Sequence, residues 1–148
     1  MSAKKKMNIR SVILASDHAG YELKEHIKKF LLRKRKKVLD LGTNNLNSVD
    51  YPDFAHLLCK KIKKNDIFGI LICGSGTGMN MAANKHKNIR AALCYNIKST
   101  KLSRQHNNAN VITLGSRLTK KHIALKCVDM FIKTSFDAGR HLRRVKKI

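Results

Sequence analysis

One glycine-rich segment, Cys73-Gly74-Ser75-Gly76-Thr77-Gly78, has residue types and spacing that could support chemistry. Glycines at alternate positions leave the backbone bare, so its N–H groups can approach an anion at the start of a helix. The segment lacks the third glycine of a dinucleotide-binding G-x-G-x-x-G motif and the Gly-Lys-Ser/Thr ending of a P-loop. It therefore predicts an anion-binding loop that begins with a thiol. The helix dipole and nearby donors would favour the thiolate of Cys73.

The other cysteines, Cys59, Cys94 and Cys127, are interpreted as small buried hydrophobic residues, as most free cysteines are. The four cysteines lie far apart and have no Cys-x-x-Cys spacing, which argues against a zinc ribbon or a disulfide scaffold. This pattern favours a reducing compartment, and we expect a cytoplasmic protein.

Polar residues also follow other short apolar runs. Asp17 and His18 come directly after the first run, and Arg117 follows the last one. Ligands of open parallel sheets bind at the carboxyl ends of the strands. In a flavodoxin-like strand order, 2-1-3-4-5, the first and third strands are neighbours. We therefore expect Asp17 and His18 to face Cys73.

The histidines fall into two groups. Three have positions that suit a proton shuttle near neutral pH: His18, His106 and His141. Four lie on lysine-rich helices or in a basic turn and are expected to be solvated: His26, His56, His86 and His122. No set of His, Cys and Asp residues has metal-ligand spacing, so no metal site is predicted.

Five short apolar runs alternate with segments of helical periodicity. The expected strands are residues 11–15, 37–41, 67–72, 89–93 and 110–114. Apolar residues recur at i, i+4, i+7 and i+8 in the helix that follows the first strand, from Leu23 to Leu31. This alternation predicts an α/β fold, a Rossmann-like αβα sandwich with a five-stranded parallel sheet in flavodoxin-like order.

The length of 148 residues suits one domain with a real hydrophobic core. We expect a basic N-terminal extension over residues 1–8 and a single domain over residues 9–148. Residues 135–148 follow the last strand–helix unit and are strongly basic. They are expected to form a C-terminal helical arm, which either frays or docks elsewhere.

Composition excludes several classes of protein. A hydrophobic content of 43% excludes a disordered chain, and no apolar run approaches the ~20 residues of a membrane span. The 32 Lys and Arg residues outnumber the 9 Asp and Glu residues, which gives a formal net charge of +23. Such a surface attracts nucleic acid nonspecifically, but the basic runs do not interleave with aromatic residues. We expect a solvated lysine-rich surface, and at most nonspecific binding of nucleic acid.

The motifs together resemble those of the type B ribose-5-phosphate isomerases and the related galactose- and allose-6-phosphate isomerases. They cover nearly the whole chain beyond its basic start, in order and at the family spacing. The segments are Ser16-Asp17-His18-Ala19-Gly20, Asp50-Tyr51-Pro52, Ile72 to Gly78, Ala82-Ala83-Asn84-Lys85, Ser103-Arg104-Gln105-His106-Asn107, Leu114-Gly115-Ser116-Arg117, and Gly139-Arg140-His141 with Arg144.

The resemblance implies an aldose–ketose isomerase that uses no cofactor. It implies a homodimer with active sites built from both subunits, or a tetramer made of such dimers. Cys73 would move a proton between C1 and C2 of the sugar, and His106, supported by Asp17, would open the furanose ring. Ser75 stands where the ribose-phosphate enzymes commonly have threonine, and it keeps a hydroxyl group.

The remaining site residues would bind the substrate. Backbone amides of the glycine loop would stabilise the enediolate oxygen, from Gly74 and Ser75 through Gly76 and Thr77 to Gly78. The phosphate would be bound, or its pocket lined, by His18, Arg117, Arg140 and Arg144, and the sugar would be contacted by Tyr51 and Asn107. Guanidinium groups suit a phosphate dianion because they can donate two hydrogen bonds to it.

The leading hypothesis is interconversion of ribose 5-phosphate and ribulose 5-phosphate through ring opening and a cis-enediolate. The nearest alternative is isomerisation of allose or galactose 6-phosphate by the same residues. A more distant alternative, suggested only by the charge, is a nucleic-acid-binding protein on an isomerase scaffold. The first hypothesis would place the protein in the pentose phosphate pathway.

Overall fold

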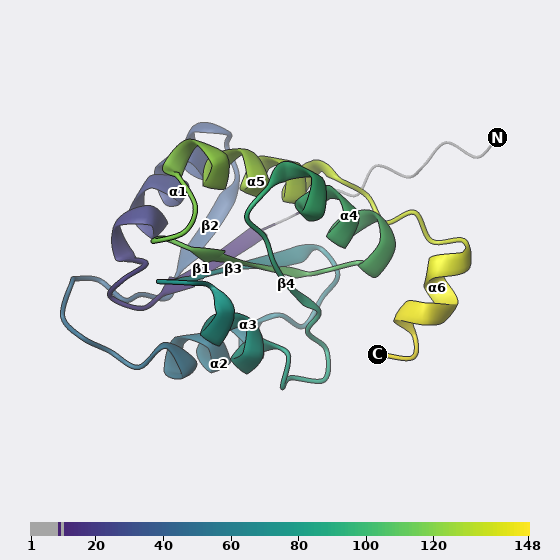
Figure 1. Ribbon diagram of the computed structural model, residues 1–148, viewed down its shortest axis with the longest axis horizontal. Helices are drawn as coiled ribbons and strands as arrows, with labels where there is room; N and C mark the ends of the chain where they lie inside the picture. The colour runs from purple at the N-terminus through teal and green to yellow at the C-terminus, as the bar shows by residue number, and fades with distance from the viewer. Residues whose placement is uncertain (1–8, 10) are drawn as a thin grey trace.

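The computed structural model describes Ile9 and residues 11–148. Within this part of the chain, five parallel strands form one sheet: β1 (Ser11–Ser16), β2 (Lys37–Asp40), β3 (Ile67–Cys73), β4 (Ala91–Leu93) and β5 (Val111–Gly115). One face is covered by α1 (Tyr21–Arg33), α4 (Ile97–Asn107) and α5 (Lys121–Lys133), and the other by α2 (Tyr51–Lys61) and α3 (Thr77–Ala83) (Figure 1). The predicted α/β sandwich is confirmed. The predicted N-terminal extension, residues 1–8, lies outside the described residues.

The strand order is β2-β1-β3-β5-β4, so the predicted flavodoxin-like order is wrong in its last two strands. The expected pairing of the first and third strands is confirmed, but β3 then pairs with β5. The burial of the two strands explains why β5, and not β4, lies next to β3. All five residues of β5 are buried, whereas β4 has three residues that are all only partly buried. The larger apolar strand gains most from an interior position that is covered on both faces.

The alternation of side chains along β3 decides which way its last residue points. Phe68, Ile70 and Ile72 belong to the core between the sheet and helices α1 and α5. Leu71 and Cys73 belong to the other core, under α2 and α3. Because successive side chains of a strand point to opposite faces, the thiol of Cys73 lies on the α2–α3 side.

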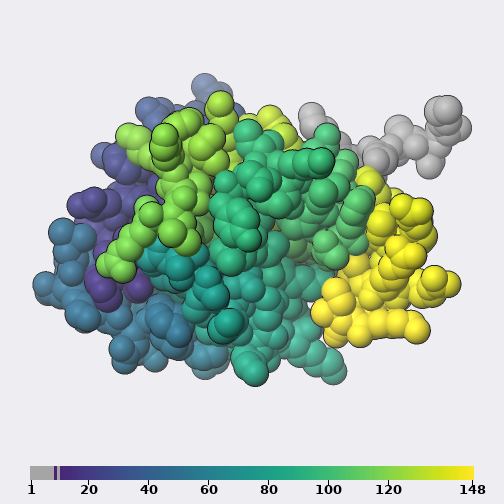
Figure 2. Space-filling view, in the orientation of Figure 1, coloured from purple at the N-terminus to yellow at the C-terminus, as the bar shows by residue number. Residues whose placement is uncertain are grey.

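Helix α4 connects the carboxyl end of β4 to the amino end of β5. It therefore runs back across the sheet, and its last residues lie at the amino edge, away from the carboxyl ends of the strands. The short helix α6 (Arg140–Val145) contacts α4 and has no buried residue. Figures 1 and 2 show it in yellow, projecting from the side of the molecule. No helix in residues 11–148 is long and apolar enough to cross a membrane.

Candidate active site

A cleft of about 400 Å³ opens at the carboxyl ends of β1 and β3. Its lining contains seven of the predicted site residues and one further residue: Asp17, Tyr51, Cys73, Gly74, Ser75, Gly78, Arg117 and Leu118. We call it the Cys73 cleft. Only 4% of Cys73 is exposed, but that residue lines the cleft and is therefore within reach of a ligand.

The glycine loop brings a hydrogen-bond donor to the thiol. The Gly76 N–H donates to the Cys73 Sγ, with 3.1 Å between nitrogen and sulfur. Gly76 adopts a left-handed backbone conformation with φ of 78°, which glycine tolerates better than any other residue. A donor at this distance stabilises a negative charge on the sulfur. The loop thus places a backbone donor on a sulfur atom whose residue lines the cleft.

Two other glycines of the loop, Gly74 and Gly78, leave room for the side chains of Arg117 and Tyr51. A Cβ atom on Gly78 would lie 2.5 Å from the Tyr51 ring, so the ring rests directly on the backbone there. A Cβ atom on Gly74 would lie 3.1 Å from a guanidinium nitrogen of Arg117. These close approaches bring an aromatic hydroxyl and a cation to the same loop as the thiol.

Asp17 and His18 both follow β1, but only Asp17 lines the Cys73 cleft. Asp17 is buried beside the cleft, where its Oδ1 accepts a hydrogen bond from the Gly20 N–H at 3.0 Å. His18 is not among the residues that line the cleft. Its Nδ1 accepts a hydrogen bond from the Val49 N–H at 3.1 Å, which places the ring against the loop after β2. The bond leaves the Nε2 of His18 as the nitrogen that carries a proton.

Four polar residues that the sequence analysis singled out lie together at a second cavity, outside the Cys73 cleft. His106, Asn107, His141 and Arg144 line a cavity of about 370 Å³ with Val145 and Ile148. We call these four residues the His106 group. The rings of His106 and His141 stack with their centroids 4.3 Å apart and their planes at 13°. Desolvation, followed by the charges of His106 and of the neighbouring arginines, lowers the pKa of His141.

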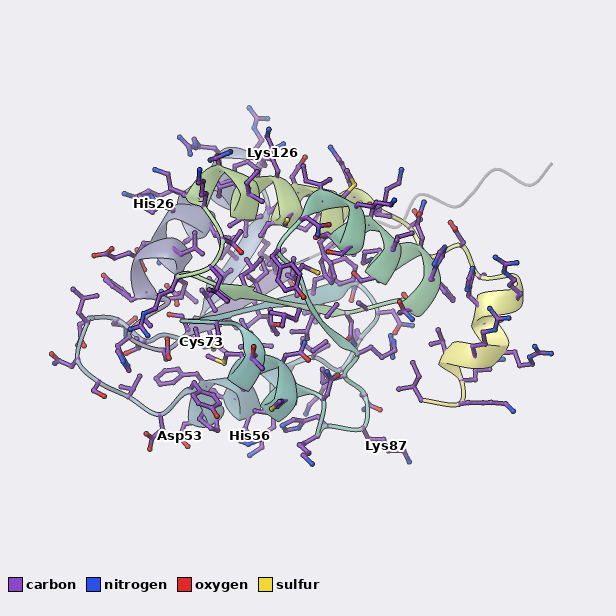
Figure 3. All side chains as sticks on the ribbon, viewed as in Figure 1. His26, Asp53, His56, Cys73, Lys87 and Lys126 are labelled. Atoms are coloured by element: carbon purple, nitrogen blue, oxygen red, sulfur yellow. The ribbon has the colours of Figure 1, made fainter. Side chains whose placement is uncertain are left out.

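The Cys73 cleft and the His106 group lie at opposite edges of the sheet. Cys73 ends β3 and is paired with Gly115, the last residue of β5. His106 lies in the last turn of α4, before β5 begins at Val111. The five residues of β5 span about 16 Å between these edges. Figure 3 shows the same separation, with Cys73 at one end of the sheet and α6 beyond the other end.

Comparison with known proteins identifies the family that the chain resembles. Residues 12–148 match the family model described as Ribose/Galactose Isomerase. A probable ribose-5-phosphate isomerase B from Mycoplasma genitalium is 48% identical over 141 residues, which are 93% of each chain. A putative sugar phosphate isomerase from Rickettsia conorii is 43% identical and covers 96% of this chain and 99% of its own.

The chain belongs to the ribose/galactose isomerase family. Solved structures of the family superpose closely on it. A ribose 5-phosphate isomerase from Thermotoga maritima has a TM-score of 0.90 at 48% identity, with 93% of this chain and 95% of that chain covered. The ribose-5-phosphate isomerase B of Mycoplasma genitalium, solved with bound ribulose-5-phosphate, has a TM-score of 0.89 at 48% identity, with 93% and 92% covered.

Isomerase chemistry requires reactive groups, which a protein supplies from side chains, from backbone donors or from a bound group. Within residue 9 and residues 11–148, no three His, Cys, Asp or Glu side chains gather as they would around a metal ion. The reactive groups that this family member does bring together are a thiol, bare amide groups, a carboxylate and a guanidinium.

Sequence reasoning missed the apolar part of both linings. Leu118 is 69% exposed and lines the Cys73 cleft, and Val145 and Ile148 line the cavity of the His106 group. The signal for Leu118 was its place directly after Arg117 at a strand end. His141 was predicted as a proton-shuttle candidate and belongs to the Gly139-Arg140-His141 motif, but it was not among the predicted site residues. Arg140 is exposed on α6 and does not line the cavity of the His106 group.

Proposed function

We propose that this chain interconverts ribose 5-phosphate and ribulose 5-phosphate. The observation that carries the proposal is the Cys73 cleft, in which a thiol and its amide donor lie beside Asp17, Tyr51 and Arg117. The relatives named as ribose-5-phosphate isomerases support the choice of a five-carbon substrate. So does the bound ribulose-5-phosphate in the Mycoplasma genitalium protein.

The reaction moves one proton between neighbouring carbons. In the open-chain aldose, the Cys73 thiolate removes the proton from C2, and negative charge develops on O1. Backbone N–H groups of residues 74–78 would stabilise this oxygen in the enediolate. The thiol then returns the proton to C1, while the proton of the O2 hydroxyl moves to O1. The ketose results with no net oxidation, and the base is regenerated.

Ring opening must come first, and it needs a second proton carrier. A proton leaves the C1 hydroxyl and another reaches the ring oxygen, and we assign this transfer to the partner's His106 with Asp17 in support. The opposite positions of Cys73 and His106 in one chain favour a homodimer whose sites combine both subunits. Arg117, His18 and the arginines of the partner's α6 would hold the phosphate. Tyr51 and the partner's Asn107 would contact the sugar.

Subunit complementation tests this assignment. Cys73→Ala and His106→Asn are each expected to be nearly inactive alone. Mixed after unfolding and refolding, they should recover about a quarter of wild-type turnover, because half of the dimers are mixed and each mixed dimer has one intact site. The matched control mixes two variants that affect the same half-site, Cys73→Ala and Asp17→Asn, and should recover nothing. Recovery in the control, or none in the test pair, contradicts the shared site.

A six-carbon aldose phosphate is the second candidate substrate, because the family description includes galactose isomerases. A pocket distinguishes one extra hydroxymethyl group by only ~1–3 kcal/mol. Competition between ribose 5-phosphate and allose or galactose 6-phosphate in one assay measures the preference directly. A kcat/KM ratio in favour of the six-carbon sugars would reject the five-carbon assignment while leaving the chemistry intact.

The four cysteines are free and buried in the structure. Free thiols are typical of a reducing compartment. We therefore place the enzyme in the cytoplasm, where it would serve the pentose phosphate pathway.

A further inference from the structure

A third cavity, of about 330 Å³, lies outside the proposed active site. Its lining comes from the turns that directly precede three strands: residues 62–65 before β3, residues 87–90 before β4, and Asn110 before β5. It therefore opens at the amino edge of the sheet, and the Cys73 cleft opens at the carboxyl edge. We call it the basic cavity. Nothing in the proposed reaction uses it.

The charge of the basic cavity is entirely positive. Lys63, Lys64, Lys87 and Arg90 line it, and its lining contains no carboxylate. The ion pairs found between described residues involve other lysines: Lys24, Lys28, Lys34 and Lys133. Four cations without a carboxylate partner repel one another, so a bound anion would stabilise this part of the molecule.

Arg90 is held in place at this cavity by hydrogen bonds. Its Nε donates to the Asn108 carbonyl oxygen at 2.8 Å, and its backbone N–H donates to the Asn110 Oδ1 at 2.8 Å. The Asn110 Nδ2 in turn donates to the Asn88 carbonyl oxygen at 2.9 Å. Burial lowers the pKa of the Arg90 guanidinium. The cavity thus has a fixed, partly desolvated cation in its wall, with lysines around it.

We propose that the basic cavity binds a small anion that carries two or more phosphate groups. Its volume is near the lower end of the range for ligand pockets, about 300 Å³, which suits a short phosphate chain better than a large organic molecule. A chain of phosphates carries more charge and more acceptor oxygens than a single phosphate, so it can contact more of these four cations at once. The chain can be free polyphosphate or the phosphate tail of a nucleoside triphosphate, since both present the same groups.

The position of the cavity makes a clear prediction about competition. The basic cavity shares no lining residue with the Cys73 cleft or with the cavity of the His106 group, so the anion and a sugar phosphate should bind at the same time. Saturating ribose 5-phosphate is therefore expected to leave the affinity for the anion unchanged. This outcome does not depend on whether the proposed isomerase activity is correct.

Calorimetric titration with tripolyphosphate and with ATP, in 150 mM salt, tests the proposal. Wild-type protein is expected to bind in the micromolar range. Lys63→Glu combined with Lys87→Glu should weaken binding at least tenfold. The matched control combines Lys29→Glu with Lys126→Glu, which changes the net charge equally at exposed positions on α1 and α5. Figure 3 shows Lys87 and Lys126 on opposite sides of the molecule. The control should bind within about threefold of wild type.

The two titrations distinguish free polyphosphate from a nucleoside triphosphate as the bound anion. Equal affinity for tripolyphosphate and ATP indicates recognition of the phosphate chain alone, and tighter binding of ATP indicates a nucleotide. Three results would overturn the proposal: equal losses in the two double variants, displacement of tripolyphosphate by ribose 5-phosphate, or binding of single-stranded RNA without binding of tripolyphosphate. Circular dichroism spectra like those of wild type confirm that both double variants are folded.

Discussion

The Cys73 cleft and the His106 group come from the same chain but are built differently. The cleft is made of strand ends and the tight loop after them, where Cys73 is paired with Gly115 through the sheet. The His106 group is made of side chains at the end of α4 and on α6, a six-residue helix with no buried residue. The first region lies on the buried ends of β3 and β5, whereas the α6 part of the second region has no buried residue.

This difference indicates how far each region depends on a second subunit for its stability. A short exposed helix is marginal on its own and gains its stability from packing. In the cleft, by contrast, the Gly76 N–H donates to the thiol and the Arg117 N–H donates to the Gly74 carbonyl oxygen, both within one chain. We therefore expect the cleft to keep its geometry in a monomer, and the His106 group to gain stability by packing against a second subunit.

The largest effect is expected from Cys73→Ala. Loss of a general base lowers turnover by about 10²–10⁴-fold, for cyclic and open-chain substrates alike. His106→Asn should instead lose mainly ring opening. Stopped-flow assays with ribose 5-phosphate and with an acyclic analogue distinguish the two. Rescue of His106→Asn, but not of Cys73→Ala, by the acyclic substrate is the expected pattern. The reverse pattern would exchange the roles of the two regions.

Arg104 connects the His106 group to the core, and its replacement is expected to have the next largest effect. The fully buried guanidinium lies 4.5 Å from the Phe68 ring centroid and donates to the Thr134 and Ala109 carbonyl oxygens. Arg104→Met keeps the packing but leaves buried acceptors without donors. It should lower the free energy of unfolding by about 2–4 kcal/mol. Lys101→Met, exposed on the same helix, is the control and should change it by less than about 0.5 kcal/mol in urea denaturation.

Sequence patterns predicted the first region better than the second for a physical reason. Strand ends are local features, so Asp17, Cys73 and the glycine loop could be placed together from the apolar runs and the expected pairing of the first and third strands. The order of β4 and β5 could not, because it depends on how much apolar area each strand buries in the finished sheet. The stack of His106 on His141 joins segments that only tertiary packing brings together. The same is true of His56 and His86, which were expected to be solvated and instead contact each other.

Arg144 and Arg143 provide a matched test of the second region. Arg144 lines the cavity of the His106 group, whereas its neighbour Arg143 does not. If α6 binds the substrate phosphate, Arg144→Ala should raise KM by about 10–50-fold, as expected for the loss of a hydrogen bond between charged groups. Arg143→Ala removes the same charge and should change KM less than about twofold. Equal effects would mean that α6 acts only through its net charge.

The smallest effect concerns the pair of His56 and His86, which lies outside the lining of the Cys73 cleft. The His56 Nδ1 lies 2.7 Å from the His86 Nε2, which joins α2 to the turn after α3. Desolvation, then the charges of His56 and Lys60, lower the pKa of His86 from its usual 6.5. The folded protein therefore resists protonation that the unfolded chain accepts. Stability should be unchanged above pH 6.5 and should fall as the pH drops below it.

Denaturation in urea at pH 5.5 and 7.5 measures this loss. His86→Gln should lose less stability on acidification than the wild type, because it lacks the group with the lowered pKa. His26→Gln, at an exposed position on α1, should behave like the wild type. The difference is expected to be small because the His86 ring is partly exposed to solvent. Identical pH dependence in all three proteins would show that the lowered pKa of His86 does not affect stability.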